Sequence, residues 1–154
     1  MLRAGAVLLT FWAGVHLVLA LGILAMMLVL GRNSPALLVL FGDTQGAGVD
    51  ARALATINAL AVLCNAWRAA MCVASLTVIW GALVRRAAWA FWTLAACACL
   101  LQAAGFASDS LLGRRELLGN AAASLVPLAG VVLAAVGVFR RPSAPAVAPQ
   151  GLVR

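Results

Sequence analysis

The sequence predicts an all-α membrane protein, a four-transmembrane-helix bundle with antiparallel, up-down connectivity. The composition is the first observation behind this prediction. The 154-residue chain is 66% hydrophobic and 10% charged, and its mean hydropathy is +1.09, whereas about a quarter of the residues of a soluble domain are usually charged. The second observation is that the apolar residues fall into four runs, each long enough to cross a hydrocarbon layer about 30 Å thick.

The four runs predict helices over residues 4–30, 54–84, 87–107 and 117–139, within one domain of residues 1–141. The first run follows Arg3, and a signal peptide is the competing interpretation of its charged start. The run stays apolar as far as Leu30, which exceeds the core of a typical signal peptide. A membrane-spanning first helix is therefore the favoured interpretation.

The segments between the runs contain turn formers and charges. Residues 31–53 are rich in Gly, Asn and Asp and predict one longer outer loop, whose apolar residues 36–41 are too few to span a bilayer. Arg85 and Arg86 separate the second and third runs so briefly that these helices must be antiparallel neighbours. Residues 109–116 predict a short polar loop, in which Asp109 or Ser110 could cap a brief helix. Residues 142–154 are rich in Pro and Ala and predict a disordered tail.

The distribution of charges predicts that both termini lie in the cytoplasm. All eleven basic residues are Arg. The inner side would hold Arg3, Arg85, Arg86, Arg140, Arg141 and Arg154, and the outer loops Arg32, Arg52, Arg114 and Arg115. Every carboxylate falls in the outer loops: Asp43, Asp50, Asp109 and Glu116. An aromatic belt near the inner surface agrees with this orientation: Trp80, Trp89, Phe91, Trp92 and Phe139.

One face of the second helix is polar. At 100° per residue, five side chains fall within roughly a third of its circumference: Asn58, Asn65, Arg68, Cys72 and Ser75. Arg68 lies twelve residues before Trp80, a rise of about 18 Å, which places it in the outer half of the hydrocarbon layer. Three interpretations stay open for Arg68: its side chain snorkels to the outer headgroups, it holds the bundle together, or it contacts a ligand.

Other helices offer polar partners at a similar depth. Gln102 lies on the third helix and Asn120 and Ser124 on the fourth, while Asp109 at the outer end of the third helix is the deepest carboxylate. Neutralising Arg68 therefore requires Asp109 or Glu116 to reach inward, or a bound anion. His16, the sole histidine, is expected to form a hydrogen bond between helices.

Small residues are expected to allow tight helix packing. Ala66, Ala70 and Ala74 recur every four positions on the second helix. A second set of small residues lies on the fourth helix: Gly130, Ala134 and Gly137.

Several kinds of site are not expected. Cys97 and Cys99 point about 200° apart on a helix, so no metal site is predicted. The sequence contains no phosphate-binding glycine loop, no nucleophile elbow and no paired carboxylates, so no cofactor is expected. An enzyme that acts on a lipid or a quinone stays open as the third functional hypothesis, behind two non-enzymatic ones, because no general base or nucleophile is evident. Nucleic acid is not an expected partner, because the arginines lie beside apolar segments rather than along a polar face.

The resulting functional prediction is a small integral inner-membrane protein, most simply an accessory or structural subunit of a membrane assembly. The absence of Lys and the abundance of Ala are typical of a GC-rich bacterial genome. The alternative is a carrier or receptor for a small anionic or amphipathic molecule, with Arg68 in a pocket that opens outward. The expected partners are the lipid bilayer and either other membrane subunits or that ligand.

Overall fold

The computed structural model describes residues 1–31, 34, 50–111 and 117–140. These residues form four α-helices and one 3-10 turn: α1 (Leu2–Leu30), α3 (Ala51–Gly81), η3 (Leu83–Arg85), α4 (Ala88–Leu111) and α5 (Leu117–Phe139). The described residues contain no strand. All four helices are long and apolar enough to cross a membrane, which confirms the predicted all-α class and the number of such helices.

The bounds of α3 and α4 differ most from the prediction, and α3 ends at Gly81 rather than at residue 84. α3 begins at Ala51 rather than at residue 54, because the Asp50 carboxylate caps it by accepting a hydrogen bond from the Arg52 N–H at 3.2 Å. α4 continues to Leu111 rather than ending at residue 107. Asp109 and Ser110 therefore belong to α4 and neither opens a polar loop nor caps a separate helix. The predicted tail at 142–154 and the apolar segment 36–41 lie outside the described residues.

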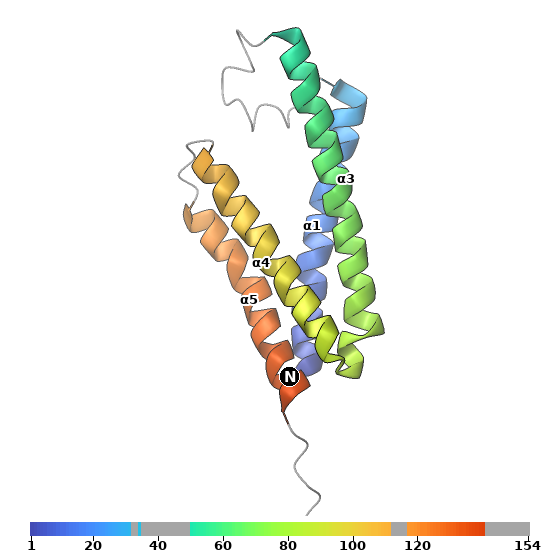
Figure 1. The fold of residues 1–154 in the computed structure, drawn as a ribbon, viewed down its shortest axis with the longest axis vertical. Coiled ribbons are helices and arrows are strands. Elements are labelled where there is room, and N and C mark those ends of the chain that lie inside the picture. The colour runs from blue at the N-terminus through green and yellow to red at the C-terminus, as the bar shows by residue number, and fades with distance from the viewer. Residues whose placement is uncertain (32–33, 35–49, 112–116, 141–154) are drawn as a thin grey trace, which may run out of the picture.

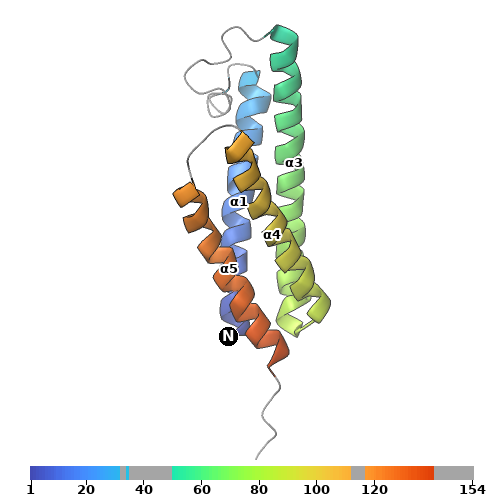
Figure 2. The ribbon, with the colours of Figure 1, turned by 60° about the vertical axis from the view of Figure 1, so that its left-hand side comes forward.

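α1 is the central helix of the arrangement (Figures 1 and 2). It packs along both α3 and α5, whereas α4 packs mainly on α5 and meets α3 near the turn that joins them. The beginning of α1 and the end of α5 lie at the same end of the molecule. Toward the opposite end, the α4–α5 pair leans away from the α1–α3 pair (Figure 1).

α1 and α5 approach each other closely, and this contact depends on glycine. A Cβ placed on Gly5 would lie 2.6 Å from the backbone nitrogen of Ala134, and a Cβ on Gly137 would overlap Leu2. Gly130 in turn lies against the side chain of Leu9. The small residues of the last helix therefore allow the backbones of α1 and α5 to approach closely, as expected.

The small residues of α3 do not serve the same purpose. Ala66, Ala70 and Ala74 are all exposed, so the expectation that they pack against a neighbouring helix of this chain is wrong. They lie on the face of α3 opposite to its buried positions Cys72, Ser75 and Ile79. In a chain rich in alanine, spacing by four residues does not indicate which face is turned inward.

The surface of the helices is largely apolar. Large exposed side chains occur on every helix: Val18, Leu28, Val29, Leu60, Leu100, Leu118 and Leu128 are examples. A soluble monomer rarely exposes so much contiguous apolar surface. The described surface is therefore compatible with a multi-pass membrane protein, whose helices are solvated by lipid.

Aromatic side chains gather where α3 ends and α4 begins. Trp80, Trp89 and Trp92 are exposed, in agreement with a belt that faces lipid. Phe91 differs, because only 6% of it is exposed and its ring meets that of Phe139 edge-to-face at 5.3 Å. Its assignment to the belt was therefore wrong, since residues 91 and 92 point in directions about 100° apart on a helix.

The α1–α5 contact leads to a prediction. Gly5→Ala should destabilise the protein by about 1–3 kcal/mol, because its Cβ meets backbone atoms that have no room to move. Unfolding of the purified protein by SDS in mixed micelles measures the change. Gly14→Ala is the matched control on the same helix, since nothing lies within 4 Å of its Cβ, and it should be neutral or stabilise by up to about 1 kcal/mol. Equal effects at both positions would contradict the close contact.

Candidate functional site

The polar stripe of α3 faces the interior of the protein. Cys72 and Ser75 are buried, and Asn58, Asn65 and Arg68 are partly buried. In contrast, Trp67 is 67% exposed and Thr77 is also exposed. The polar stripe of α3 is therefore turned toward the other helices, while the opposite face of α3 is mainly apolar. Thr77 lies on that opposite face, and its hydroxyl donates to the Val73 carbonyl of the same helix at 3.0 Å.

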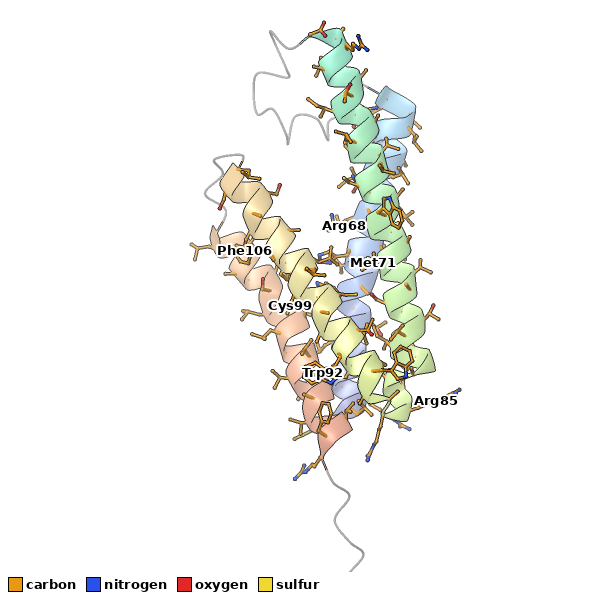
Figure 3. All side chains as sticks on the ribbon, in the orientation of Figure 1. Arg68, Met71, Arg85, Trp92, Cys99 and Phe106 are labelled. Atoms are coloured by element: carbon orange, nitrogen blue, oxygen red, sulfur yellow. The ribbon has the colours of Figure 1, made fainter. Side chains whose placement is uncertain are left out.

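Arg68 is the charged residue of this stripe. Its Nε is fully covered and has no hydrogen-bond acceptor among the described residues. Cys72 follows Arg68 by one turn on the same face of α3. Figure 3 shows Arg68 on the side of α3 that is turned toward α4. A covered N–H of a charged group without an acceptor is costly in an apolar bundle, so the surroundings of Arg68 favour a negatively charged neighbour.

The described side chains supply no carboxylate for Arg68. The one acid whose side chain is described, Asp50, caps the first turn of α3, eighteen residues or about 27 Å along the helix from Arg68. Asp109 belongs to α4, but its side chain lies outside the described part of the structure, as does Glu116. An internal ion pair with either acid therefore stays a prediction.

His16 forms a hydrogen bond within its own helix. Its Nδ1 lies 3.0 Å from the Trp12 carbonyl oxygen, and the two rings are 5.1 Å apart. Because a carbonyl only accepts, Nδ1 carries the proton and Nε2 is left to face its surroundings. The expected hydrogen bond between helices is therefore not the one that His16 Nδ1 makes.

Gln102 and Ser124 connect α4 to α5. The Ser124 Oγ lies 3.1 Å from Gln102 Oε1 and 2.7 Å from the Asn120 carbonyl oxygen. A hydroxyl has a single proton to donate, and the Asn120 carbonyl is the nearer acceptor. The Gln102 amide therefore serves the contact best when its NH₂ group is turned toward Ser124.

The remaining predicted partners do not join this connection. Asn65 donates from Nδ2 to the Ala61 carbonyl at 2.8 Å, one turn back on α3. The Oδ1 of Asn58 is buried and has no partner among the described residues. The predicted contacts thus divide. Gln102 and Ser124 meet across the boundary between α4 and α5, whereas the Asn65 amide donates within α3 and the Asn58 Oδ1 has no partner among the described residues.

An apolar cluster crosses the bundle below these residues. Trp12, Ala13 and Ala98 are buried in it, with Leu76, Leu101 and Val126 packed against them. His16 follows Trp12 by four residues, Gln102 follows Ala98 by four, and Cys72 precedes Leu76 by four. Because α1 and α4 run in the direction opposite to α3 and α5 (Figure 1), these residues all lie on the same side of the cluster, about one helical turn away.

These polar residues from four helices form what we call the polar layer: His16, Arg68, Cys72, Gln102 and Ser124. It lies on the side of the apolar cluster that is farther from the N-terminus, where the α4–α5 pair diverges from the α1–α3 pair (Figure 1). Within the layer, Arg68 is the one permanently charged residue. Arg68 can hold an anion by its charge, and the amide and hydroxyl groups of α4 and α5 lie at a similar level along the bundle.

Sequence analysis did not single out two buried polar groups of α1. The Trp12 Nε1 and the Thr10 Oγ1 are buried and have no hydrogen-bond partner among the described residues. The spacing of four residues between Trp12 and His16 was an available signal that they share a face of α1. For Thr10 the sequence offered no comparable signal.

Compared with known proteins, the chain matches no family model, and neither a curated protein nor a solved structure is significantly similar to it. Within the described ranges, no three His, Cys, Asp or Glu residues lie close enough to hold a metal ion. The candidate function therefore depends on the polar layer itself.

The α4–α5 connection leads to a second prediction. Gln102→Leu and Ser124→Ala should each destabilise the protein, and together they should show a coupling energy of about 0.6 kcal/mol, since they remove the same interaction. SDS unfolding of the two single variants and the double variant gives this value. Pairing Gln102→Leu with Thr93→Ala is the control, because the Thr93 hydroxyl bonds to its own helix and its effect should be additive.

Proposed function

We propose that this chain is a bacterial inner-membrane protein that binds a small anionic or amphipathic molecule at Arg68, as a carrier or receptor. The observation that supports this proposal is the partly buried guanidinium, whose covered Nε has no acceptor among the described residues. An arginine that served only to hold the helices together would be expected to donate to groups on neighbouring helices. A bound anion would satisfy it instead.

The ligand is expected to carry one negative charge. Arg68 is the one fixed charge among the five residues of the polar layer, and the other four carry neutral amide, hydroxyl, thiol and imidazole groups. A monoanion would leave the layer neutral, whereas a dianion would leave an uncompensated charge in an apolar bundle. The planar guanidinium suits a carboxylate, which it can bind through two parallel hydrogen bonds.

The proposed topology is a single-domain bundle with up-down connectivity and both termini in the cytoplasm. It is supported by the exposed arginines at the end where α1 begins and α5 finishes: Arg3, Arg85, Arg86 and Arg140. Arg68 then lies in the outer half of the membrane, and the ligand reaches the polar layer from the outer side.

The topology is tested by fusing reporters to the carboxyl terminus. A green fluorescent protein fusion should fluoresce and an alkaline phosphatase fusion should be inactive, because the first matures in the cytoplasm and the second in the periplasm. The opposite pair of results would contradict the orientation and would place Arg68 in the inner half of the membrane.

Ligand binding is tested with benzoate, a soluble amphipathic monoanion, and with neutral benzamide as its isostere. Isothermal titration of the protein in nanodiscs should show benzoate binding, and Arg68→Gln should weaken it at least tenfold, since a charge-assisted hydrogen bond contributes about 1.5–3 kcal/mol. Benzamide should bind weakly to both proteins.

Arg52→Gln is the matched control, because Arg52 is exposed on the same helix and its loss should leave benzoate binding unchanged. If Arg68→Gln binds benzoate as the wild type does, the proposed site is wrong. If Arg68→Gln and Arg68→Lys destabilise the bundle equally with and without benzoate, the arginine serves packing instead.

The second candidate is the accessory or structural subunit. It is favoured by the exposed row of Ala66, Ala70 and Ala74 on α3, which presents small side chains to the surroundings. Recovery of a stoichiometric protein partner after mild detergent extraction, and its loss from an Ala70→Leu variant, would support this function over ligand binding.

A further inference from the structure

Four arginines lie at one end of the described molecule. Arg3 follows Leu2, Arg85 and Arg86 follow Leu83, and Arg140 follows closely on Val138. Leu2, Leu83 and Val138 all belong to one packed cluster, so the arginines surround the same end of the bundle. All four are exposed, and the acidic residues of the described helices, Asp50 and Asp109, lie toward the opposite ends of α3 and α4.

The same end carries aromatic side chains that face outward. Trp80, Trp89 and Trp92 are 54%, 60% and 64% exposed. Trp92 is held beside Phe139, with ring centroids 6.2 Å apart, so α4 and α5 both contribute. Tryptophan prefers the level of the lipid headgroups, where its ring is in apolar surroundings and its N–H reaches water. This places the neighbouring arginines at the depth of the lipid phosphates.

Two of the arginines belong to a defined turn rather than to a loose loop. η3 ends in a tight reversal in which the Arg86 N–H donates to the Leu83 carbonyl at 2.8 Å and the Ala87 N–H to the Ala82 carbonyl at 3.2 Å. Arg86 has a left-handed backbone, with φ 62° and ψ 28°, a conformation that glycine adopts without steric cost. The backbone of the turn would accept glycine at position 86, so the charged side chain of Arg86 is not needed to form the turn. Figure 3 shows Arg85 extending away from the helices at this end.

We infer that Arg85 and Arg86, with Arg140 and Arg3 beside them, form a docking surface for the headgroups of anionic phospholipids. Charge complementarity supports this occupant, because the four arginines have no carboxylate beside them among the described residues. The adjoining exposed side chains are apolar or tryptophan, which suits acyl chains next to the phosphates. Arginine also binds phosphate oxygens through two parallel hydrogen bonds. The surface is separate from Arg68 and does not depend on the proposed ligand.

The test uses the full-length protein in mild detergent with an equal mixture of phosphatidylglycerol and phosphatidylcholine, and counts the retained lipids by native mass spectrometry. Wild-type protein should retain phosphatidylglycerol preferentially. An arginine near the membrane surface contributes about 1 kcal/mol, or about fivefold in affinity, so Arg85→Gln with Arg86→Gln should reduce the preference about 25-fold. Arg140→Gln should reduce it about fivefold and serves as a second variant if the double variant fails to fold.

Arg52→Gln is the charge-matched control at the other end of α3 and should keep the wild-type preference. Inorganic phosphate should not displace the lipid, because it lacks the acyl chains. Equal retention of both lipids by the wild type, or a double variant indistinguishable from Arg52→Gln, would overturn the inference. It would also be overturned if the double variant released bound nucleic acid while its lipid preference stayed unchanged.

Discussion

The close contact between α1 and α5 is the constraint on which the rest of the structure depends. Helices in lipid gain little from burying apolar surface, so they associate through close packing and polar contacts. Gly5, Gly130 and Gly137 allow backbone contact at the end where α1 begins. Higher in the bundle the Trp12 side chain occupies the space between the helices. Small residues at one end and a large one farther along explain why α4 and α5 lean away from α1 and α3 (Figure 1).

The separation of the α4–α5 pair from the α1–α3 pair determines which polar groups find hydrogen-bond partners. Where α4 and α5 stay together, Gln102 and Ser124 can satisfy each other across the helix boundary. α3 and α4 have separated at the same level, so the polar face of α3 has no α4 partner at hydrogen-bond distance among the described residues. Asn65 therefore turns to its own backbone, and Arg68 keeps an unsatisfied Nε. In the polar layer, Gln102 and Ser124 have hydrogen-bond partners, whereas the Arg68 Nε has none among the described residues. A ligand would therefore gain most binding free energy at Arg68.

The sequence predicted the features that follow from local composition. It did not predict the features that depend on how the helices pack against one another. Continuous apolar runs predicted the four helices, because lipid requires a minimum length. The polar face of α3 was also predictable, since polar side chains inside a membrane are turned away from lipid. The outward direction of Ala66, Ala70 and Ala74 was not predictable, because alanine is accepted by lipid and by a helix interface alike. Phe91 is buried and Trp92 is exposed because the two side chains point in different directions from α4. The hydrogen bond from His16 to the Trp12 carbonyl depends on the rotamer of the histidine, which the sequence does not determine.

Arginine occurs in two environments in this chain, and the difference between them determines what each can bind. Arg85 and Arg86 are exposed beside tryptophans at one end of the bundle, where the proposed partners are numerous lipid phosphates in exchange with water. Each such contact is weak and screened by salt, so only several arginines together give a preference. Arg68 is partly buried within the polar layer, where screening is small and competing water is limited. A single anion held there would be bound by one strong charge interaction, which every small monoanion can make, so discrimination between such anions would depend on the neutral groups of the polar layer.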